Sequence, residues 1–217
     1  MKVVPRVLSA LAVLAALAAC DLPPEPTDDP PPSTPAASTS APPTTPSRPA
    51  PSPARFNKAL HDELVAMLKR DQADREGKPQ SESDQARTAR LKEIIRTYGW
   101  PTLSLVGKDG EDAAWAIAQH SDLDPAFQQE ALELLRAAVA ARQASPGNLA
   151  YLEDRVAAGK GEPQVYGTQV RCGPDGPVLA TPIKDESGVE QRRAQAGLPT
   201  LASYLAELTA ICAEDGN

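Results

Sequence analysis

Apolar residues recur at intervals of three and four along most of the chain after residue 55. This spacing places them on one face of an α-helix. It predicts seven helical segments, at residues 56–76, 84–98, 111–120, 125–142, 149–158, 188–196 and 200–211. Capping residues agree with these limits, because Gly99 and Pro101 follow the second segment and Asp124-Pro125 is a typical helix start.

Two β-prone runs, Gln164–Cys172 and Val178–Ile183, interrupt the helical pattern. The residues between them, Gly173–Pro177, are rich in glycine and proline, which indicates a hairpin. Thr102–Val106 is also short and β-prone, and we expect a loop or an isolated bridge there. The sequence therefore predicts a mainly α fold: a single compact multi-helix domain of about six or seven helices with one small β-hairpin near Gln164–Ile183.

The first twenty residues have the composition of a secretory signal peptide. Lys2 and Arg6 precede an uncharged run at residues 7–17, which is too short to span a hydrocarbon core of about 30 Å. The run ends in Leu-Ala-Ala-Cys, which resembles the lipobox of bacterial lipoproteins. The resemblance implies that Cys20 is the lipid attachment site, acylated with palmitate. The alternative is cleavage at a nearby small residue, with Cys20 unmodified.

Residues 21–54 are dominated by Pro, Ser, Thr and Ala, a composition that cannot bury enough apolar surface to fold. We expect a disordered linker that reaches roughly 100 Å when extended and carries a domain at residues 55–217. The expected partner is a membrane, reached through the N-terminal lipid, and the expected location is the extracytoplasmic cell envelope. Asp21 favours the periplasmic side of the inner membrane in a Gram-negative cell, and a Gram-positive surface stays open.

Charge and cysteine content narrow the possible partners of the domain. Residues 55–217 hold 19 Lys+Arg and 25 Asp+Glu, interspersed along the chain, without a basic stripe. Nucleic acid is therefore not an expected partner. Cys172 and Cys212 are expected to form a disulfide, because thiols outside the cytoplasm tend to pair. The alternative is two unpaired cysteines.

Five short polar motifs follow one another along the domain: Asp71-Gln72-x-x-Arg75, Tyr98-Gly99-Trp100-Pro101, Gln119-His120, Tyr151-Leu152-Glu153-Asp154-Arg155 and Tyr166-Gly167-Thr168-Gln169. Together they resemble the pattern of an uncharacterised bacterial domain-of-unknown-function family. The resemblance covers residues 56–208. It implies no reaction and no ligand, because the family has none assigned.

The motif residues stand at helix ends and on the hairpin, from which polar side chains can converge on one cleft. A network that locks the helices to the hairpin would use the same residue types, and both interpretations stay open. Asp71 and Arg75 can also form an ordinary surface pair at i,i+4. The candidate ligand-binding residues are Asp71, Gln72, Arg75, Trp100, Gln119, Glu153, Arg155, Tyr166, Thr168 and Gln169.

One catalytic arrangement can be assembled from these motifs. His120 would be a general base or acid, and Glu153 or Asp154 would orient it. The alternative is a structural histidine bonded to Asp122 or to a carbonyl group. The domain has two histidines, His61 and His120, without metal-ligand spacing, and it has no phosphate-binding loop, so neither a metal nor a cofactor is expected. His61 is expected to be a solvated residue beside the linker.

These observations leave three functional hypotheses. The first is a membrane-tethered envelope lipoprotein whose domain binds a small ligand, a peptide or a protein partner. The second is a hydrolase-like enzyme with a polar cleft centred on His120. The third is an immunity or inhibitor lipoprotein that neutralises an envelope-acting toxin, since an acidic domain complements a basic enzyme.

Overall fold

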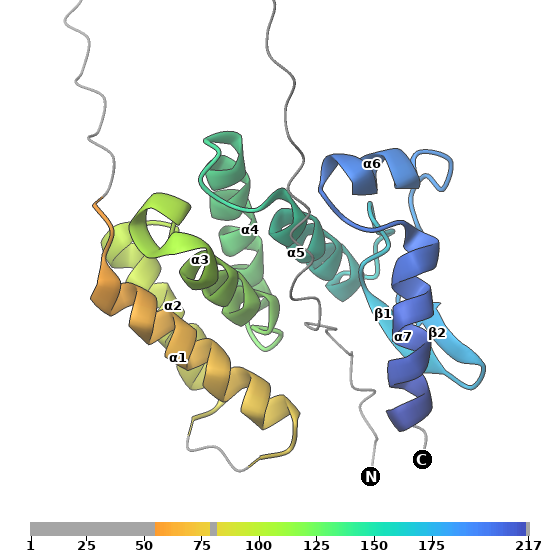
Figure 1. The fold of residues 1–217 in the computed structure, drawn as a ribbon, viewed down its shortest axis with the longest axis horizontal. Coiled ribbons are helices and arrows are strands. Elements are labelled where there is room, and N and C mark those ends of the chain that lie inside the picture. The colour runs from red at the N-terminus through yellow and green to blue at the C-terminus, as the bar shows by residue number, and fades with distance from the viewer. Residues whose placement is uncertain (1–54, 79–81, 216–217) are drawn as a thin grey trace, which may run out of the picture. The chain divides into compact units, whose positions relative to one another are not determined.

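The computed structural model describes residues 55–78 and 82–215. This part of the chain has seven helices and one antiparallel hairpin, so the predicted mainly α single domain is confirmed (Figure 1). None of the helices in these two ranges is long and apolar enough to cross a membrane. The predicted signal peptide, Cys20 and the linker lie outside the described residues.

The first two helices, α1 (Lys58–Arg75) and α2 (Asp84–Tyr98), have the limits that the sequence predicts to within two residues. Each begins with a side-chain cap. The interior positions of their apolar faces are buried, whereas Phe56 and Tyr98, at the ends of the predicted segments, are 51% and 49% exposed. Phe56 precedes α1, and Tyr98 is the last residue of α2, where a helix face no longer meets its neighbours.

The third helix, α3 (Leu103–Gln119), begins eight residues earlier than predicted. The β-prone segment after Pro101 forms a helical turn instead of a loop, and Leu105 and Val106 are buried there. Gly107, with a φ of 71°, then kinks the helix. At this kink, His61 Nδ1 lies 2.7 Å from the Val106 carbonyl oxygen. His61 is therefore a half-buried residue that supports the kink, and the prediction of a solvated side chain is wrong.

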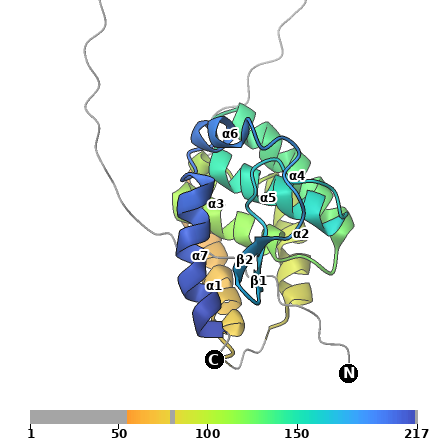
Figure 2. The same cartoon turned by 90° about the vertical axis from the view of Figure 1, so that its right-hand side faces the viewer.

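Two further helices, α4 (Pro125–Ala140) and α5 (Pro146–Gly159), each start with proline after a capping residue. Asp124 caps α4 as predicted, and its side chain accepts a hydrogen bond from Phe127 N at 3.1 Å. Ser145-Pro146 repeats the same signal, so α5 begins three residues before the predicted start. Helix α3 lies at the centre of this part of the domain and contacts α1, α2, α4 and α5 (Figures 1 and 2).

The C-terminal part of the domain contains β1 (Val170–Gly173), β2 (Gly176–Leu179), α6 (Val189–Gln195) and α7 (Leu201–Asp215). Helix α7 packs on the hairpin (Figures 1 and 2). A separate small apolar cluster fills this contact, formed by Val170, Tyr204 and Leu208. The strands are shorter than predicted, because residues 164–169 form a loop with only an isolated bridge between Gln164 and Ile183.

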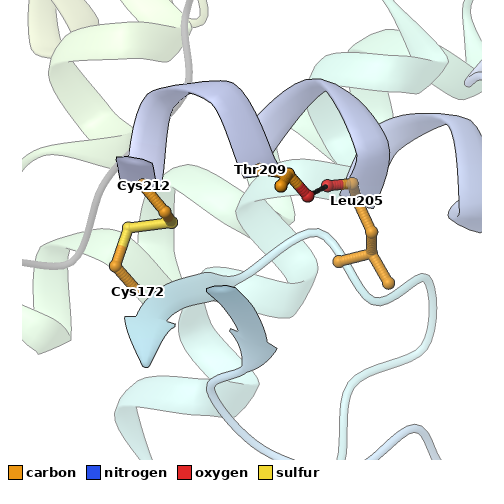
Figure 3. The surroundings of a disulfide bond; sticks show 4 residues. All are labelled: Cys172, Leu205, Thr209 and Cys212. Atoms are coloured by element: carbon orange, nitrogen blue, oxygen red, sulfur yellow. Dashed lines mark hydrogen bonds between the residues drawn. A yellow bond between two sulfur atoms is a disulfide. The ribbon is translucent and has the colours of Figure 1, made fainter. Parts of the chain in front are cut away.

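A disulfide between Cys172 and Cys212 joins β1 to α7, with 5.3 Å between the two Cα atoms (Figure 3). The predicted pairing is confirmed. One helical turn before Cys212, the Thr209 hydroxyl donates to the Leu205 carbonyl at 3.0 Å. Both residues belong to α7, so this hydrogen bond does not join the helix to the hairpin. The covalent bond and the apolar cluster both hold α7 on the hairpin.

Replacement of both Cys172 and Cys212 by serine is expected to destabilise the domain by about 4 kcal/mol, since the bond closes a loop with a sequence separation of 40 residues. Denaturant unfolding measures the loss, and hydrogen exchange should show that α7 amides lose protection before those of α3. Thr209→Ala, on the exposed side of the same helix, is the control and should leave both unchanged. Unaltered α7 protection in the serine variant would contradict the role of the bond.

Candidate functional site

His120 follows the last residue of α3, and the side chains of α1 surround its ring. Its Nδ1 lies 2.8 Å from Asp71 Oδ2 and 3.0 Å from Arg75 Nε. Nδ1 cannot both donate to Asp71 and accept from Arg75 in one neutral tautomer. We assign the proton to Nδ1, because the carboxylate can only accept and Arg75 already has Asp71 as its acceptor, with Nε 3.2 Å from Oδ2 and Nη2 3.0 Å from Oδ1.

Asp71 is the centre of this arrangement and is fully buried. Burial opposes its ionisation, but hydrogen bonds from His120 and Arg75 outweigh that cost and lower the pKa of Asp71 to about 2. Gln72 Nε2 also donates to Asp71, at 2.9 Å. The pair of Asp71 and Arg75 is therefore not the ordinary surface pair that the sequence allowed. It is a buried carboxylate that a half-exposed arginine covers.

The second ring nitrogen of His120 has a different environment. Burial lowers the pKa of His120, and although Asp71 favours the charged form, we take the ring as neutral at pH 7. With the proton on Nδ1, the Nε2 atom carries a lone pair. That atom is buried and has no hydrogen-bond partner among the described residues. The arrangement can accept a proton or a hydrogen bond at one defined position.

Arg87 completes the charge cluster from α2, and the sequence did not single it out. Its side chain is 1% exposed, and Nη2 lies 3.0 Å from Asp74 Oδ2 and 2.5 Å from Asp84 Oδ1. Arg87 occupies the apolar face of α2, four residues before the buried Leu91. A charged residue on the apolar face of a predicted helix is the signal from which a buried Arg87 could have been predicted.

Asp154 does not orient His120, so that part of the catalytic hypothesis is wrong. Its carboxylate accepts hydrogen bonds from Val165 N at 2.6 Å, from Thr168 N at 2.8 Å, and also from Tyr166 N and the Thr168 hydroxyl. These bonds replace the ladder bonds of a strand, which explains why residues 164–169 are a loop. Glu153 forms its ion pair with Arg136, at 3.6 Å, and not with His120.

Arg155 connects the end of α3 to the loop before the hairpin. Its Nε and Nη2 donate to the two carboxylate oxygens of Asp122, at 2.9 and 2.5 Å, and its Nη1 donates to Gln169 Oε1 at 3.1 Å. Gln128 binds Asp122 as well. Asp122 therefore binds Arg155 and Gln128. It does not bind His120, as the alternative of a structural histidine proposed.

The structure thus separates the predicted site residues into groups. Asp71, Gln72, Arg75 and His120 meet at the ends of α1 and α3, while Arg155 and Gln169 form a second set with Asp122. The remaining residues, Trp100, Gln119, Glu153, Tyr166 and Thr168, have no hydrogen bond or ion pair with His120. Most motif residues bind one another, which supports the predicted locking network more than a single cleft.

Glu111 was missed by the sequence interpretation, which treated it as a helix-start residue. It is fully buried on α3, where its Oε2 accepts from Asn148 Nδ2 at 3.0 Å and Trp100 lies beside it. Burial, together with the charge of Asp112, raises the pKa of Glu111 to about 7. In the two described ranges, no three His, Cys, Asp or Glu side chains are placed to share a metal ion.

The fold and the networks define a helical domain in which buried polar groups join the helices to a C-terminal hairpin unit. Comparison with protein families shows that the chain belongs to the family of unknown function DUF6624, whose model matches residues 58–213. The predicted membership in an uncharacterised domain family is confirmed. Neither the curated proteins nor the solved structures contain a significant match.

Glu111 should make the stability of the domain depend on pH. Its pKa in the folded state is about 7, above its ordinary value, so the folded domain binds the additional proton. The contribution of Glu111 to the free energy of unfolding is therefore largest below about pH 4.5, and it falls by about 3 kcal/mol as the pH rises to 7. Glu111→Gln should remove this decrease in the free energy of unfolding with rising pH, which denaturant unfolding at pH 5, 6, 7 and 8 measures.

The exposed Glu162 provides the control for this experiment, because Glu162→Gln leaves the buried carboxyl group in place. The control should keep the full slope. Equal pH dependence in the wild type and in Glu111→Gln would contradict the assignment.

Proposed function

We propose that this protein is a bacterial envelope lipoprotein, anchored through Cys20, whose helical domain binds a small polar ligand at His120. The observation that carries the proposal is the geometry of one side chain. Asp71 fixes the ring of His120 at Nδ1, and Nε2 is left as a buried acceptor that has no partner in the part of the chain that the structure describes. An unsatisfied buried acceptor costs free energy in the unliganded protein, and a ligand donor would recover it.

Arg75 supplies the second feature of the proposed site. Its side chain is 36% exposed, and only its Nε and Nη2 are used by Asp71, Asp84 and His120. The Nη1 edge has no acceptor among the described residues and remains available for an anionic group. The ligand class that this arrangement favours carries a hydroxyl or amide donor for His120 Nε2 and an acidic group for Arg75.

The lipid anchor is tested with the full chain expressed in a bacterial host and labelled with an alkyne fatty acid. The wild type should incorporate the label and sediment with membranes, because Cys20 follows a lipobox-like sequence. Cys20→Ala should lose the label and leave the membrane fraction. Labelling that persists in Cys20→Ala would rule out the anchor without affecting the ligand site.

The ligand site is tested by thermal shift and calorimetry on the full chain with hydroxy acids, amino sugars and acidic cell-wall peptides. His120→Asn is the informative variant, since the asparagine amide can still donate to Asp71 while the Nε2 acceptor is removed. We expect a ligand that stabilises the wild type, and binding at least tenfold weaker in His120→Asn, with unfolding free energy within about 1.5 kcal/mol of the wild type.

His61→Ala is the matched control, because His61 is the domain's other histidine and makes its bond to Val106 on another part of α3. This variant should keep the ligand-induced shift. If a ligand binds the wild type and His120→Asn equally, the site is elsewhere. If His120→Asn loses the fold, the ring is a structural element and the proposal fails.

A hydrolase-like activity is the second candidate, and the Asp71–His120 pair favours it. A carboxylate that orients a neutral imidazole is the usual arrangement of a general base. Burial keeps His120 neutral at pH 7, the state that accepts a proton. Turnover of a bound ester or amide by the wild type, lost in His120→Asn, would favour catalysis over binding alone.

A further inference from the structure

Two aromatic side chains of the described residues are exposed, and both stand at the outer limits of the first two helices. Phe56 lies just before α1, and Tyr98 is the last residue of α2. The other exposed large apolar residues, Leu123 and Val178, lie in the turn after α3 and on β2. The two exposed rings therefore belong to a different surface from the other two residues.

Ion pairs between α1 and α2 show that these helices are antiparallel. Arg70, near the end of α1, binds Glu82, which lies just before α2. Arg90, further along α2, binds Glu63 near the start of α1. The start of α1 and the end of α2 are therefore at the same end of the domain, and the two exposed rings are there as well.

The start of α3 and the end of α4 complete this end of the domain (Figure 1). Asn57 N donates to the Leu105 carbonyl at 2.7 Å, and Leu103 N donates to the Gln143 carbonyl at 2.9 Å. Residues 1–54 of the chain are joined to the domain here, at Arg55. We therefore call this surface the linker end, and it consists of residues 55–58, 96–109 and 140–144.

The linker end is basic, although the domain as a whole is acidic. Residues 55–217 hold 19 Lys+Arg and 25 Asp+Glu, whereas the three segments of the linker end hold five basic residues and one acidic residue, Asp109. Lys58 and Lys108 each pair with an aspartate one turn further into their helices, and exposed pairs of this kind are weak. All five basic residues are exposed: Arg55, Lys58, Arg96, Lys108 and Arg142.

We infer that the linker end binds the surface of a membrane that contains anionic phospholipids. Exposed aromatic rings enter the headgroup region of a bilayer, and exposed Lys and Arg side chains bind its negative headgroups. The choice of a membrane over an acidic protein rests on the proposed lipid anchor. The chain from Cys20 enters the domain at Arg55, so an anchored lipid keeps a bilayer within reach of this surface and of no other by a shorter length of chain.

This surface is separate from the ligand site proposed at His120. Asp71 and Arg75 lie at the other end of α1, about 25 Å from Phe56 at the rise of an α-helix. His120 likewise follows the last residue of α3, whereas the linker end contains the first turn of that helix. A domain bound to a membrane through the linker end therefore keeps the His120 site away from the bilayer.

The test measures binding of the full chain to vesicles of phosphatidylcholine and to vesicles of an equal mixture of phosphatidylcholine and phosphatidylglycerol. Every protein in the series carries Cys20→Ala, so no attached lipid contributes and residues 1–54 are the same throughout. We expect stronger binding to the mixed vesicles, and salt should weaken it. Hydrogen exchange should slow at the linker end and stay unchanged in α7. Equal binding to both kinds of vesicle, or slower exchange in α7 instead of the linker end, would overturn the inference.

Two double variants test the side chains of the linker end. Lys58→Glu with Lys108→Glu reverses two charges and should weaken binding to the mixed vesicles at least tenfold, since each basic residue near an anionic surface contributes about fivefold. Phe56→Ser with Tyr98→Ser removes both rings and should weaken binding about tenfold. All four side chains are exposed, so both variants should unfold at the same denaturant concentration as the parent chain.

Matched controls make the same changes on other surfaces. Lys160→Glu with Lys184→Glu reverses two exposed charges, and Leu123→Ser with Val178→Ser removes two exposed apolar side chains. Both controls should bind the mixed vesicles like the parent chain. If the controls lose as much binding as the linker-end variants, total charge and apolar surface decide and the inference is wrong. The result does not depend on whether Cys20 is acylated, because no protein in the series contains it.

Discussion

The carboxylate of Asp154 holds the two parts of the domain together. It accepts hydrogen bonds from the backbone of Val165, Tyr166 and Thr168 while it is itself fully buried on α5. From the other side, Arg192 and Arg193 of α6 donate to the carbonyl groups of Val165 and Tyr166. One short loop therefore has its donors bound by α5 and its acceptors bound by α6, and the position of the hairpin follows from it.

That loop depends on a backbone conformation that glycine allows. Gly167 has a φ of 70°, and a Cβ atom there would lie 2.9 Å from Ile183 Cδ1. Its conformation brings the amides on either side of it, those of Tyr166 and Thr168, to one carboxylate. The loop in turn positions Tyr166 and Thr168 against α6 and α7, so the surroundings of Arg193 are a consequence of how Asp154 binds the loop.

Much of the fold could be predicted from local patterns. Helix limits were accurate where a cap and a periodic apolar face coincide, as at Asp124-Pro125, and the disulfide partners followed from counting cysteines. The site was predicted only in part. The sequence named His120 and Asp71 but paired His120 with the wrong carboxylates, because Asp71 and His120 are 49 residues apart and no local signal joins them.

The sequence by itself determined the helical class, the hairpin and the set of polar motifs, since each depends on neighbours within a few residues. It also determined the disulfide, because the domain contains only two cysteines. Only the tertiary structure decided which charges are neutralised internally and which are not. No local pattern tells that Arg87 and Arg155 meet aspartates while Arg193 meets the Tyr204 ring and carbonyl groups. The reason is that burial and pairing of a charge depend on residues brought together from distant helices.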